Sequence, residues 1–419
     1  MKVLIVNKFL HPNGGSETYI FKLGEELQRQ GHEVQFFGME HEGRIVGNRV
    51  NSYTSNMDFH GGSKLSKILY PLKTIYSFEA RKALRKVLDD FVPDILHVNN
   101  FNYQLTPSIL VEARKWEKRT GHKIKIVYTA HDYQIVCPNH MLNNPNTNEN
   151  CEKCLGGHYG QCCSNRCIHG SVVKSLIGTM EAVYWNSRKV YKEFDVIICP
   201  SDFLKSKLDT NPILAERTRT VRNFIDVESV DHLDFSDKEA KDYVLYFGRF
   251  AEEKGIRTFM ESIDCMKEKT KIVFAGKGPL EEEVNSFCKS MTEKGHSVCN
   301  VGFRTGQDLQ KLICNAMFTV YPSTWYENGP FSIMESQAYG VPVIGSALGG
   351  IPELIEDGIT GRLFDCGDAQ GLAKIMDELV GNPQTVTEMS ACCAKLKRRN
   401  CEEYTKLTVD EIYLDYGDK

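Results

Sequence analysis

Short apolar runs alternate with helical stretches along almost the whole chain. Each run is nearly continuous in hydrophobic residues, which is typical of strands that helices cover on both faces of a parallel sheet. The first half contains KVLIVN, EVQFFG, DILHVNN, IKIVYTA and DVIICPS, and the second half contains TVRNFI, YVLYFGR, KIVFAGKG, FTVYPS and VPVIGS. Two such arrays predict an α/β protein with two doubly wound domains.

The expected domain boundaries follow from this alternation. A chain of 419 residues is long enough for two or three domains, each with its own core. We expect a first domain over residues 1–218, which contains a cysteine-rich insert at about 137–170, and a second domain over residues 219–398. Residues 399–419 have the pattern of a final helix.

Composition narrows the class of protein. Hydrophobic residues make up 41% of the chain and charged residues 25%, as in ordinary globular proteins. No run of eighteen apolar residues occurs, which speaks against a membrane span. The opening MKVLIVNKFLHPNGGSE reads as a strand and a loop rather than a signal peptide, so we expect a cytoplasmic protein. No basic patch is interleaved with aromatic residues and the pI is near 6.3, so nucleic acid is not an expected partner.

Charge is distributed unevenly between the two halves. Residues 1–200 carry 25 Lys and Arg against 19 Asp and Glu, whereas residues 201–419 carry 26 against 36. Within the first half, residues 62–90 combine many basic residues with apolar ones at helical spacing. This pattern is compatible with peripheral contact to an anionic membrane on its inner face. A solvated helix face would have the same pattern, and both interpretations stay open.

The stretch from Tyr321 to Glu353, YPSTWYENGPFSIMESQAYGVPVIGSALGGIPE, contains the parts of an anion-binding site. Pro330 favours a helix start, because its ring fixes φ and its missing N–H is not needed at the first helical position. The residue before a proline avoids helical geometry, so Glu327 should lie in a loop. The helix would then present the free amides of Phe331, Ser332 and Ile333 to a phosphate, with Glu335 one turn further along.

Glu327 and Glu335 together resemble the EX7E signature of retaining glycosyltransferases of group 1, or family 4, which use nucleotide-sugar donors. The resemblance implies the GT-B fold, in which two Rossmann-like domains face each other across a cleft and a C-terminal helix returns to the first domain. It also implies that Glu335 accepts hydrogen bonds from ribose hydroxyls and that Glu327 holds a hydroxyl of the donor sugar. Gly329, Pro330, Phe331 and Ser332 would meet phosphate or sugar. Two solvated glutamates beside a surface helix are the alternative.

A second donor element precedes this stretch. In YVLYFGRFAEEKG, Arg249 follows a strand and Lys254 comes before a helix, so two cations could neutralise a diphosphate. This element resembles the G-R-x(4)-K-G motif of the same family, in which both cations grip the donor phosphates. Gly276 and Gly278 in AGKGPL resemble the family's G-x-G-P turn, and Phe303 in VGFR lies where relatives seat the base. The alternatives are a solvated turn with an Arg–Glu pair and ordinary glycine turns after strands.

The first domain supplies two further candidates. Gly14 and Gly15 follow the opening strand, where the backbone can approach a ligand closely. They resemble the family's glycine loop over donor phosphate and acceptor; the alternative is a strand–helix turn capped by Ser16. His131 also follows a strand, and the resemblance implies that it orients the donor sugar, although a histidine there is often a structural hydrogen bonder. Asp132 should support His131 or cap the next segment.

Cysteines concentrate between Cys137 and Cys167. The surrounding segment is polar and glycine-rich, so it needs additional support to hold its shape. In a cytosolic protein the spacing favours a structural tetrahedral zinc site over disulfides. The expected ligands are Cys151, Cys154, Cys162 and Cys167, with Cys163 or His158 as substitutes. A flexible loop of free thiols is the alternative.

These features together predict a retaining glycosyltransferase that transfers a sugar from a nucleoside-diphosphate sugar to an acceptor hydroxyl. UDP is the favoured nucleotide, the acceptor a carbohydrate or lipid-linked sugar, and the pathway cell-surface polysaccharide or glycolipid synthesis. We expect His131, Glu327, Arg249 and Lys254 to be catalytic, with no catalytic metal because protein cations take its place. A nucleotide-sugar hydrolase or epimerase and a zinc-organised binding protein on a silent GT-B scaffold are the alternatives.

Overall fold

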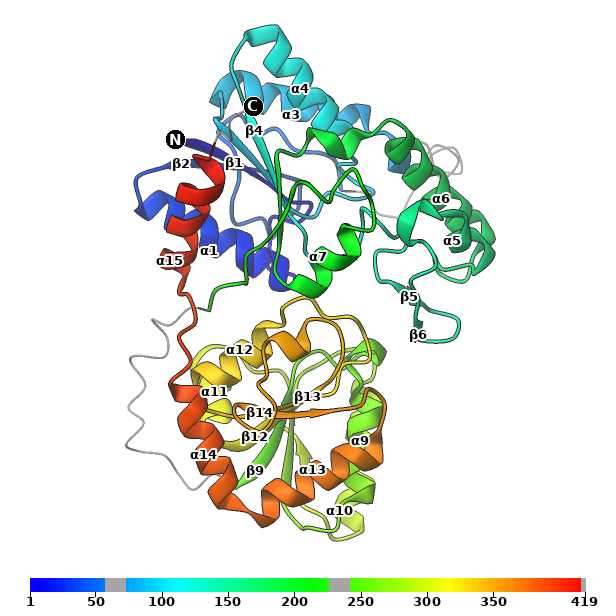
Figure 1. Ribbon diagram of the computed structural model, residues 1–419, viewed down its shortest axis with the longest axis vertical. Coiled ribbons are helices and arrows are strands. Elements are labelled where there is room, and N and C mark those ends of the chain that lie inside the picture. Colours follow the sequence, from blue (N-terminus) through cyan, green and yellow to red (C-terminus); the bar gives the residue numbers. More distant parts are fainter. Residues whose placement is uncertain (57–72, 226–241, 416–419) are drawn as a thin grey trace. The chain divides into compact units, whose positions relative to one another are not determined.

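The computed structural model describes residues 1–56, 73–225 and 242–415. The chain forms two compact units, one of Met1–Arg222 with Cys401–Lys419 and the other of Asn223–Asn400. The expected boundaries at 218 and 398 differ from these by a few residues. Each unit is an α/β domain built on its own parallel sheet (Figure 1).

The N-terminal unit contains a six-stranded sheet in the order β2-β1-β3-β4-β7-β8. All neighbouring strands pair in parallel. The bounds are β1 Lys2–Val6, β2 Glu33–Phe37, β3 Ile95–Val98, β4 Lys125–Thr129, β7 Val196–Cys199 and β8 Thr218–Thr220. Strands β3, β4 and β7 are buried along their full length, as their continuous apolar runs predicted.

Helices cover this sheet and are capped by serines at several starts. The bounds are α1 Gly15–Arg29, α3 Phe78–Phe91, α4 Ser108–Thr120, α6 Val172–Ser187 and α7 Asp202–Leu208. The side chains of Ser77, Ser171 and Ser201 each accept a hydrogen bond from the amide three residues further on. These contacts satisfy amides that the helix itself leaves unpaired.

The cysteine-rich insert lies between β4 and α6. It contains a short hairpin of β5 (Asn143–Asn144) and β6 (Glu149–Asn150), a 3-10 turn η1 (Leu155–Gly157) and the helix α5 (Gly160–Ser164). A small buried cluster holds these pieces together: Cys154, Tyr159, Cys162, Cys167 and Ala182.

The end of the chain packs onto the N-terminal unit. Helix α15 (Cys401–Leu407) contacts α1, and the π-helical turn η6 (Thr408–Tyr413) contacts β4. At the surface Arg29 pairs with Glu402 at 3.1 Å and Arg219 pairs with Asp415 at 3.2 Å. Residues 401–415 are thus an integral part of the first domain.

A buried network of hydroxyl and imidazole groups anchors this C-terminal segment. The Tyr404 hydroxyl lies 2.9 Å from that of Tyr19, which lies 3.2 Å from the Thr129 hydroxyl. His97 bridges the Tyr413 hydroxyl at 2.5 Å and Thr129 at 2.7 Å. Because burial of an unpaired polar group is costly, these five residues fix the position of the segment mutually.

The C-terminal unit repeats the architecture. Its parallel strands follow the order β11-β10-β9-β12-β13-β14, so both units contain a six-stranded parallel sheet, although the strand orders differ. The predicted fold class is confirmed. The strands are β9 Tyr243–Phe247, β10 Lys271–Ala275, β11 Val298–Asn300, β12 Ala316–Tyr321, β13 Val343–Ser346 and β14 Gly361–Phe364. The helices are α9 Ile256–Cys265, α10 Glu281–Glu293, α11 Gly306–Cys314, α12 Phe331–Ala338, α13 Ala369–Gly381 and α14 Pro383–Ala394.

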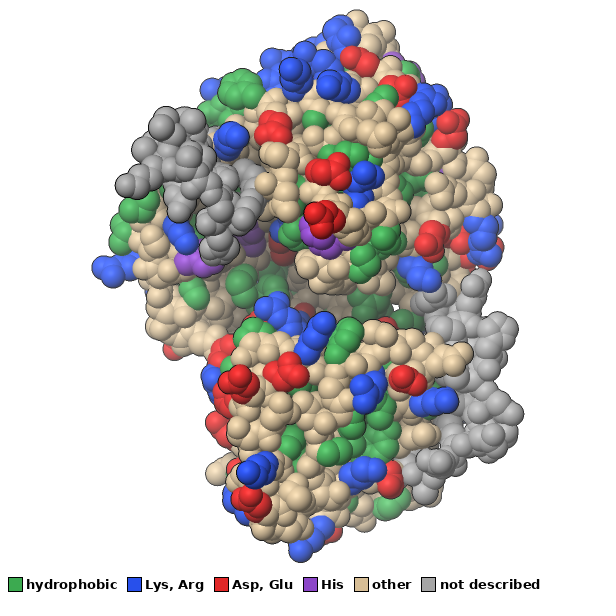
Figure 2. All heavy atoms as spheres, turned by 180° about the vertical axis from the view of Figure 1, so that it is seen from behind, with side chains coloured by type: hydrophobic (Ala, Val, Ile, Leu, Met, Phe, Trp, Pro, Cys, Tyr) green, Lys and Arg blue, Asp and Glu red, His purple; other side chains and the backbone are tan. Residues whose placement is uncertain are grey.

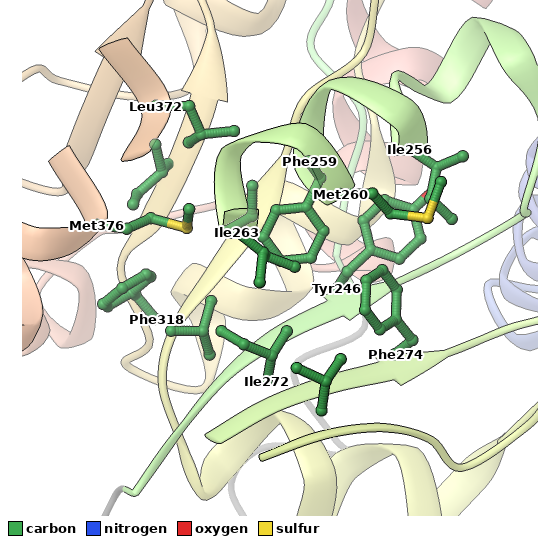
Figure 3. Close-up of a cluster of buried hydrophobic side chains, with 14 of the residues drawn as sticks. Tyr246, Ile256, Phe259, Met260, Ile263, Ile272, Phe274, Phe318, Leu372 and Met376 are labelled. Carbon is green, nitrogen blue, oxygen red and sulfur yellow. The ribbon is translucent and has the colours of Figure 1, made fainter. Parts of the chain in front are cut away.

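The main core of this unit lies between the sheet and the helices α9 and α13 (Figure 3). Phe259, Met260 and Ile263 from α9 pack against Tyr246 of β9 and Phe274 of β10. Leu372 and Met376 of α13 complete the cluster. The Tyr246 hydroxyl leaves this core to donate to the carbonyl of Arg249 at 2.9 Å. The core thereby positions the loop that follows β9.

We predict that Tyr413→Phe destabilises the N-terminal unit. The change removes the hydroxyl that pairs with the buried His97 and leaves one ring nitrogen unsatisfied, at a cost of about 1–3 kcal/mol. Urea unfolding followed by tryptophan fluorescence measures the difference. Tyr184→Phe is the matched control, since the Tyr184 hydroxyl has no hydrogen bond with any described residue. Equal losses in the two variants would contradict the network's role.

Candidate functional site

The candidate site of the C-terminal unit is built from loops at the carboxyl ends of β10, β9, β12 and β13. These four strands are neighbours in the sheet, so the loops that follow them meet at one edge. In open parallel sheets this edge is where ligands bind.

The loops after β9 and β12 are hydrogen-bonded to each other. The carbonyl of Glu253 accepts from the Ser323 hydroxyl at 3.0 Å and from the amide of Thr324 at 3.1 Å. Gly255 has a φ of +66°, and a Cβ at this position would lie 1.7 Å from the carbonyl oxygen of Pro322. Only glycine permits this approach, which brings Lys254 beside the loop after β12.

Lys254 and Glu327 form a largely buried ion pair. The Lys254 Nζ lies 2.6 Å from Glu327 Oε1, with 22% and 11% of the two side chains exposed. The same carboxylate oxygen accepts from Ser323 Oγ at 3.0 Å, and Nζ lies 3.5 Å from the Tyr321 hydroxyl. Burial lowers the pKa of Lys254, but the charge of Glu327 and its hydrogen bond outweigh burial and raise the pKa overall. Lys254 is therefore charged, and its ammonium group is already paired with the carboxylate of Glu327.

Arg249 is the more accessible of the two predicted cations. Its side chain is 64% exposed and lies 3.8 Å from Glu253. At that distance and exposure the pairing is weak, so the guanidinium can turn to another anion.

The loop after β13 fixes the backbone around Glu327. The amide of Gly350 donates to the Glu327 carbonyl at 2.6 Å. Gly349 has a φ of +63°, and a Cβ there would lie 2.7 Å from the backbone nitrogen and oxygen of Glu327. The GGIPE stretch thus requires glycine because it packs directly against the backbone of the first glutamate.

Helix α12 begins one residue later than predicted. Pro330 is its N-cap, with a ψ of 123°, and the helix runs over Phe331–Ala338. The fixed φ of proline therefore serves the turn that enters the helix rather than the first helical position. Gly329 lies in the entering loop, and its carbonyl accepts from Asn223 at 3.2 Å. The first helical amides are still those of Phe331, Ser332 and Ile333, as the sequence predicted.

Glu335 lies one turn inside α12 in a half-buried position. Burial raises the pKa of its carboxyl above the ordinary value. Within the described residues no hydrogen bond or ion pair to this carboxylate occurs. Glu335 therefore has its hydrogen-bonding capacity free, at a cost in stability.

Gly276 and Gly278 hold the loops after β9 and β10 together. A Cβ at Gly276 would lie 2.0 Å from the carbonyl oxygen of Gly248, and one at Gly278 would lie 2.4 Å from that of Phe250. Packing against the loop after β9 therefore requires glycine at both positions, apart from any role in donor binding. Phe303 is an exposed ring with the Lys277 ammonium 4.5 Å from its centroid.

In the N-terminal unit, the loop after β1 leads into α1 at the two predicted glycines. Gly14 is the N-cap of α1 in extended backbone, and Gly15 is the first helical residue. Ser16 does not cap the helix; its hydroxyl donates to Glu17 at 3.0 Å and accepts from Asn100 at 2.9 Å. The capping alternative is therefore wrong, because the helix starts one residue before Ser16.

His131 is a neutral imidazole at the carboxyl end of β4. Its Nε2 lies 2.9 Å from the Asn99 side-chain oxygen, and the Asn99 amide nitrogen points to the Val6 and His97 carbonyls. Nε2 must therefore carry the hydrogen, which makes Nδ1 the acceptor. Burial lowers the pKa of His131 to about 4. Tyr19 packs its edge against the ring with centroids 5.1 Å apart.

Asp132 caps the next segment, accepting from the amide of Gln134 at 2.8 Å.

Sequence reasoning missed the asparagines that follow β3. Asn99 holds His131, while Asn100 binds Ser16 in the loop after β1. Asn102 hydrogen-bonds His140, which is buried enough to lower its pKa to about 3. The sequence HVNNFN indicates these residues, because it has three asparagines directly after a buried strand. The carboxyl end of that strand lies at the same sheet edge as His131.

Three of the four expected zinc ligands, Cys154, Cys162 and Cys167, lie in one buried cluster. The thiols that interact are Cys137 with Cys154 and Cys162 with Cys167. Cys151 instead continues the hairpin, its amide donating to the Leu142 carbonyl at 2.7 Å. Among the described residues no three His, Cys, Asp or Glu side chains are arranged to hold a metal ion. A structural zinc site formed by Cys151, Cys154, Cys162 and Cys167 stays a prediction.

The predicted membrane segment is only partly visible. Residues 57–72, which contain its first cations, lie outside the described residues. In α3, Arg81 and Arg85 bind the buried carboxylate of Glu112 at 2.6 and 2.5 Å, so these two cations have a structural role. Lys and Arg side chains also gather on the surface at the end of the N-terminal unit where α3 and α4 lie (Figure 2). No helix in the described ranges is long and apolar enough to span a bilayer.

We predict that Glu335→Gln stabilises the C-terminal unit at neutral pH. The folded-state pKa is raised above the unfolded value, so ionisation of Glu335 opposes folding above the folded pKa and has no effect below the unfolded one. The variant should gain of the order of 1 kcal/mol at pH 7–8, and the gain should vanish as the pH falls toward about 4. Thermal unfolding against pH measures this, with the exposed Glu293→Gln in α10 as control. A pH-independent difference would show that charge is not the cause.

Comparison with known proteins identifies the family. The sequence model described as Glycosyltransferase Family 4 matches residues 13–229, and that described as Glycosyl transferases group 1 matches residues 231–404. The N-acetyl-alpha-D-glucosaminyl L-malate synthase of Bacillus anthracis is 23% identical over 371 residues, 86% of this chain and 83% of the relative. The amylovoran biosynthesis glycosyltransferase AmsK of Erwinia amylovora is 30% identical over 163 residues, 37% of this chain and 40% of the relative.

Solved structures share the fold over nearly the whole chain. Anabaena HepE in complex with UDP has a TM-score of 0.66 at 16% identity, covering 98% of this chain and 99% of that one. Sucrose-phosphate synthase from Thermosynechococcus elongatus has a TM-score of 0.67 at 16% identity, covering 98% of each chain. With both family models matched and two Rossmann-like domains observed, the chain belongs to glycosyltransferase family 4 and has the GT-B fold.

Proposed function

We propose that this glycosyltransferase transfers a sugar from UDP-sugar to an acceptor hydroxyl with retention of configuration, in cell-surface polysaccharide or glycolipid synthesis. The UDP in the HepE structure supports the choice of nucleotide. The name of AmsK, which refers to amylovoran biosynthesis, supports a role in polysaccharide biosynthesis.

The observation that carries the proposal is the Lys254–Glu327 pair beside the free N-terminus of α12. In this arrangement the amides of Phe331 and Ser332 and the exposed Arg249 would receive the diphosphate. Glu327, held rigidly by Lys254, would accept a hydrogen bond from a donor-sugar hydroxyl. Glu335, whose carboxylate is otherwise unused, would accept from the ribose.

The chemical step we propose is front-face attack. The acceptor oxygen bonds to the anomeric carbon on the face from which the phosphate oxygen departs, and that oxygen takes the acceptor proton. The transition state has oxocarbenium character, so charge neutralisation of the leaving group supplies much of the rate. Arg249 and Lys254 provide the neutralising cations, and the proposal needs no catalytic metal. Because His131 is neutral, its role would be to orient the sugar through hydrogen bonds rather than to contribute a positive charge.

Two other functions compete with this proposal. A nucleotide-sugar hydrolase or epimerase would release UDP or change the donor without any acceptor. A binding protein on a silent scaffold has no need of the four charged groups at 249, 254, 327 and 335, all of which are present and two of which are held in a buried pair. The intact site therefore favours a transferase.

The donor prediction is that UDP or a UDP-sugar raises the melting temperature and that Glu335→Ala abolishes the rise. At a nucleotide concentration about 100 times Kd the stabilisation should be about 2.7 kcal/mol. A thermal-shift panel of UDP, GDP, ADP, CDP and dTDP with their common sugars measures it. Glu293→Ala, on the exposed face of α10, is the control and should keep the full shift. A shift with another nucleotide would correct the base, and no shift with any would overturn the donor site.

The stereochemical prediction is that the new linkage keeps the anomeric configuration of the donor. Proton NMR of the product, through the coupling constant of its anomeric proton, distinguishes the two configurations. An inverted linkage would contradict front-face attack while leaving donor recognition intact. UDP release that does not depend on an acceptor would point instead to the hydrolase.

A further inference from the structure

Helix α6 carries an unusual row of exposed apolar side chains. Five of them are between 47% and 67% exposed: Val172, Val173, Leu176, Met180 and Val183. From Val173 onward they recur every three or four residues, and Val172 is four residues before Leu176, so all five lie on one side of the helix. Figure 2 shows hydrophobic side chains at the surface along the edge of the N-terminal unit where α6 lies. Such a stripe, on a helix of otherwise ordinary length, is typical of an interaction surface.

The rest of α6 explains why this face stays outside. The buried face consists of small residues and one tryptophan: Ser175, Gly178, Ala182 and Trp185. The Trp185 ring stacks on Tyr76 with centroids 5.5 Å apart, and its Nε1 donates to the Ile75 carbonyl at 2.8 Å. Because this tight packing fixes the rotation of the helix, the apolar row cannot turn inward.

Both ends of α6 are basic. Exposed cations occur in its first turn and just beyond its end: Lys174, Arg188, Lys189 and Lys192. The Arg188 guanidinium lies 4.5 Å from the centroid of the Tyr184 ring, so it follows the helix surface. The one carboxylate in α6, Glu181, has its pKa raised to about 8 by burial, so it is mostly protonated at pH 7. The charge that α6 presents is therefore positive.

We propose that the outer face of α6 binds the surface of an anionic lipid bilayer. The apolar row would enter the boundary between headgroups and acyl chains, while the flanking cations meet lipid phosphates. A second copy of the chain fits less well. A two-fold contact would place basic ends against basic ends, and like charges brought together in an interface are unfavourable.

This surface differs from the basic pattern at residues 62–90, for which the sequence is equally compatible with membrane contact and with a solvated helix face. It also shares no residue with the proposed donor site, because every residue involved belongs to the N-terminal unit and none is assigned to catalysis. Failure of one proposal therefore leaves the other unaffected.

The test is vesicle flotation of the full chain with the double variant Leu176→Gln/Met180→Gln. Wild type should float with vesicles that contain phosphatidylglycerol and bind pure phosphatidylcholine far more weakly. The double variant should lose about tenfold or more in partitioning, since two apolar side chains no longer enter the lipid. Arg188→Gln should lose roughly fivefold on anionic vesicles only. Ile45→Gln, an equally exposed apolar position in the same unit, is the control and should float like wild type.

Three further readouts decide the interpretation. The UDP thermal shift of the double variant should equal that of wild type, which separates loss of lipid binding from loss of the fold or the donor site. Wild-type flotation that the double variant retains would overturn the assignment to α6. Sedimentation that shows a wild-type dimer and a monomeric double variant, without flotation of either, would overturn the lipid proposal in favour of self-association.

Discussion

The buried ion pair between Lys254 and Glu327 is the interaction on which the donor end of the C-terminal unit depends. It joins two loops that are separated in sequence by three helices and three strands, α9 to β12, and the Glu327 backbone is in turn held by the amide of Gly350. A buried pair of this kind is not a large net source of stability, but removal of one partner leaves the other charge uncompensated. Its main consequence is that the glutamate is already oriented before any ligand arrives, which reduces the cost of organising the site.

This pairing also changes how charge is divided within the site. Lys254 contributes its charge from within the pair with Glu327, whereas Arg249 and the amide end of α12 have no comparably strong partner and are the more available groups for a diphosphate. Arg249 and the amides of α12 are only weakly paired with other groups, so they can bind the negative charge that develops on the departing phosphate. The Lys254–Glu327 pair keeps its geometry during this step. The half-buried Glu335 adds the opposite feature: a carboxylate kept without a described partner, at the expense of stability, is typical of a group reserved for a ligand.

Much of the architecture could be predicted, because continuous apolar runs that alternate with helices leave few arrangements other than covered parallel sheets. The closeness of Glu327, Glu335 and the start of α12 could also be predicted, because all three belong to one short stretch of sequence. The partners of these residues could not be predicted. That Lys254 is held by Glu327 depends on loop contacts through Gly255 and Ser323. The interaction of Cys137 with Cys154 could not be predicted either, because the two residues are 17 positions apart and chain spacing does not reveal their pairing.

The N-terminal unit shows how far such non-local contacts extend. Tyr404 and Tyr413 provide hydroxyls that Tyr19 and His97 would otherwise lack, and Tyr19 packs against the ring of His131. The unit is therefore completed by residues that are separated from its sheet by the entire second domain. Closing that long loop is slow relative to local contacts, so the first domain should reach its final packing only after the second has been made. The orientation of His131 is thus coupled, through two buried tyrosines, to the last helical turns of the chain.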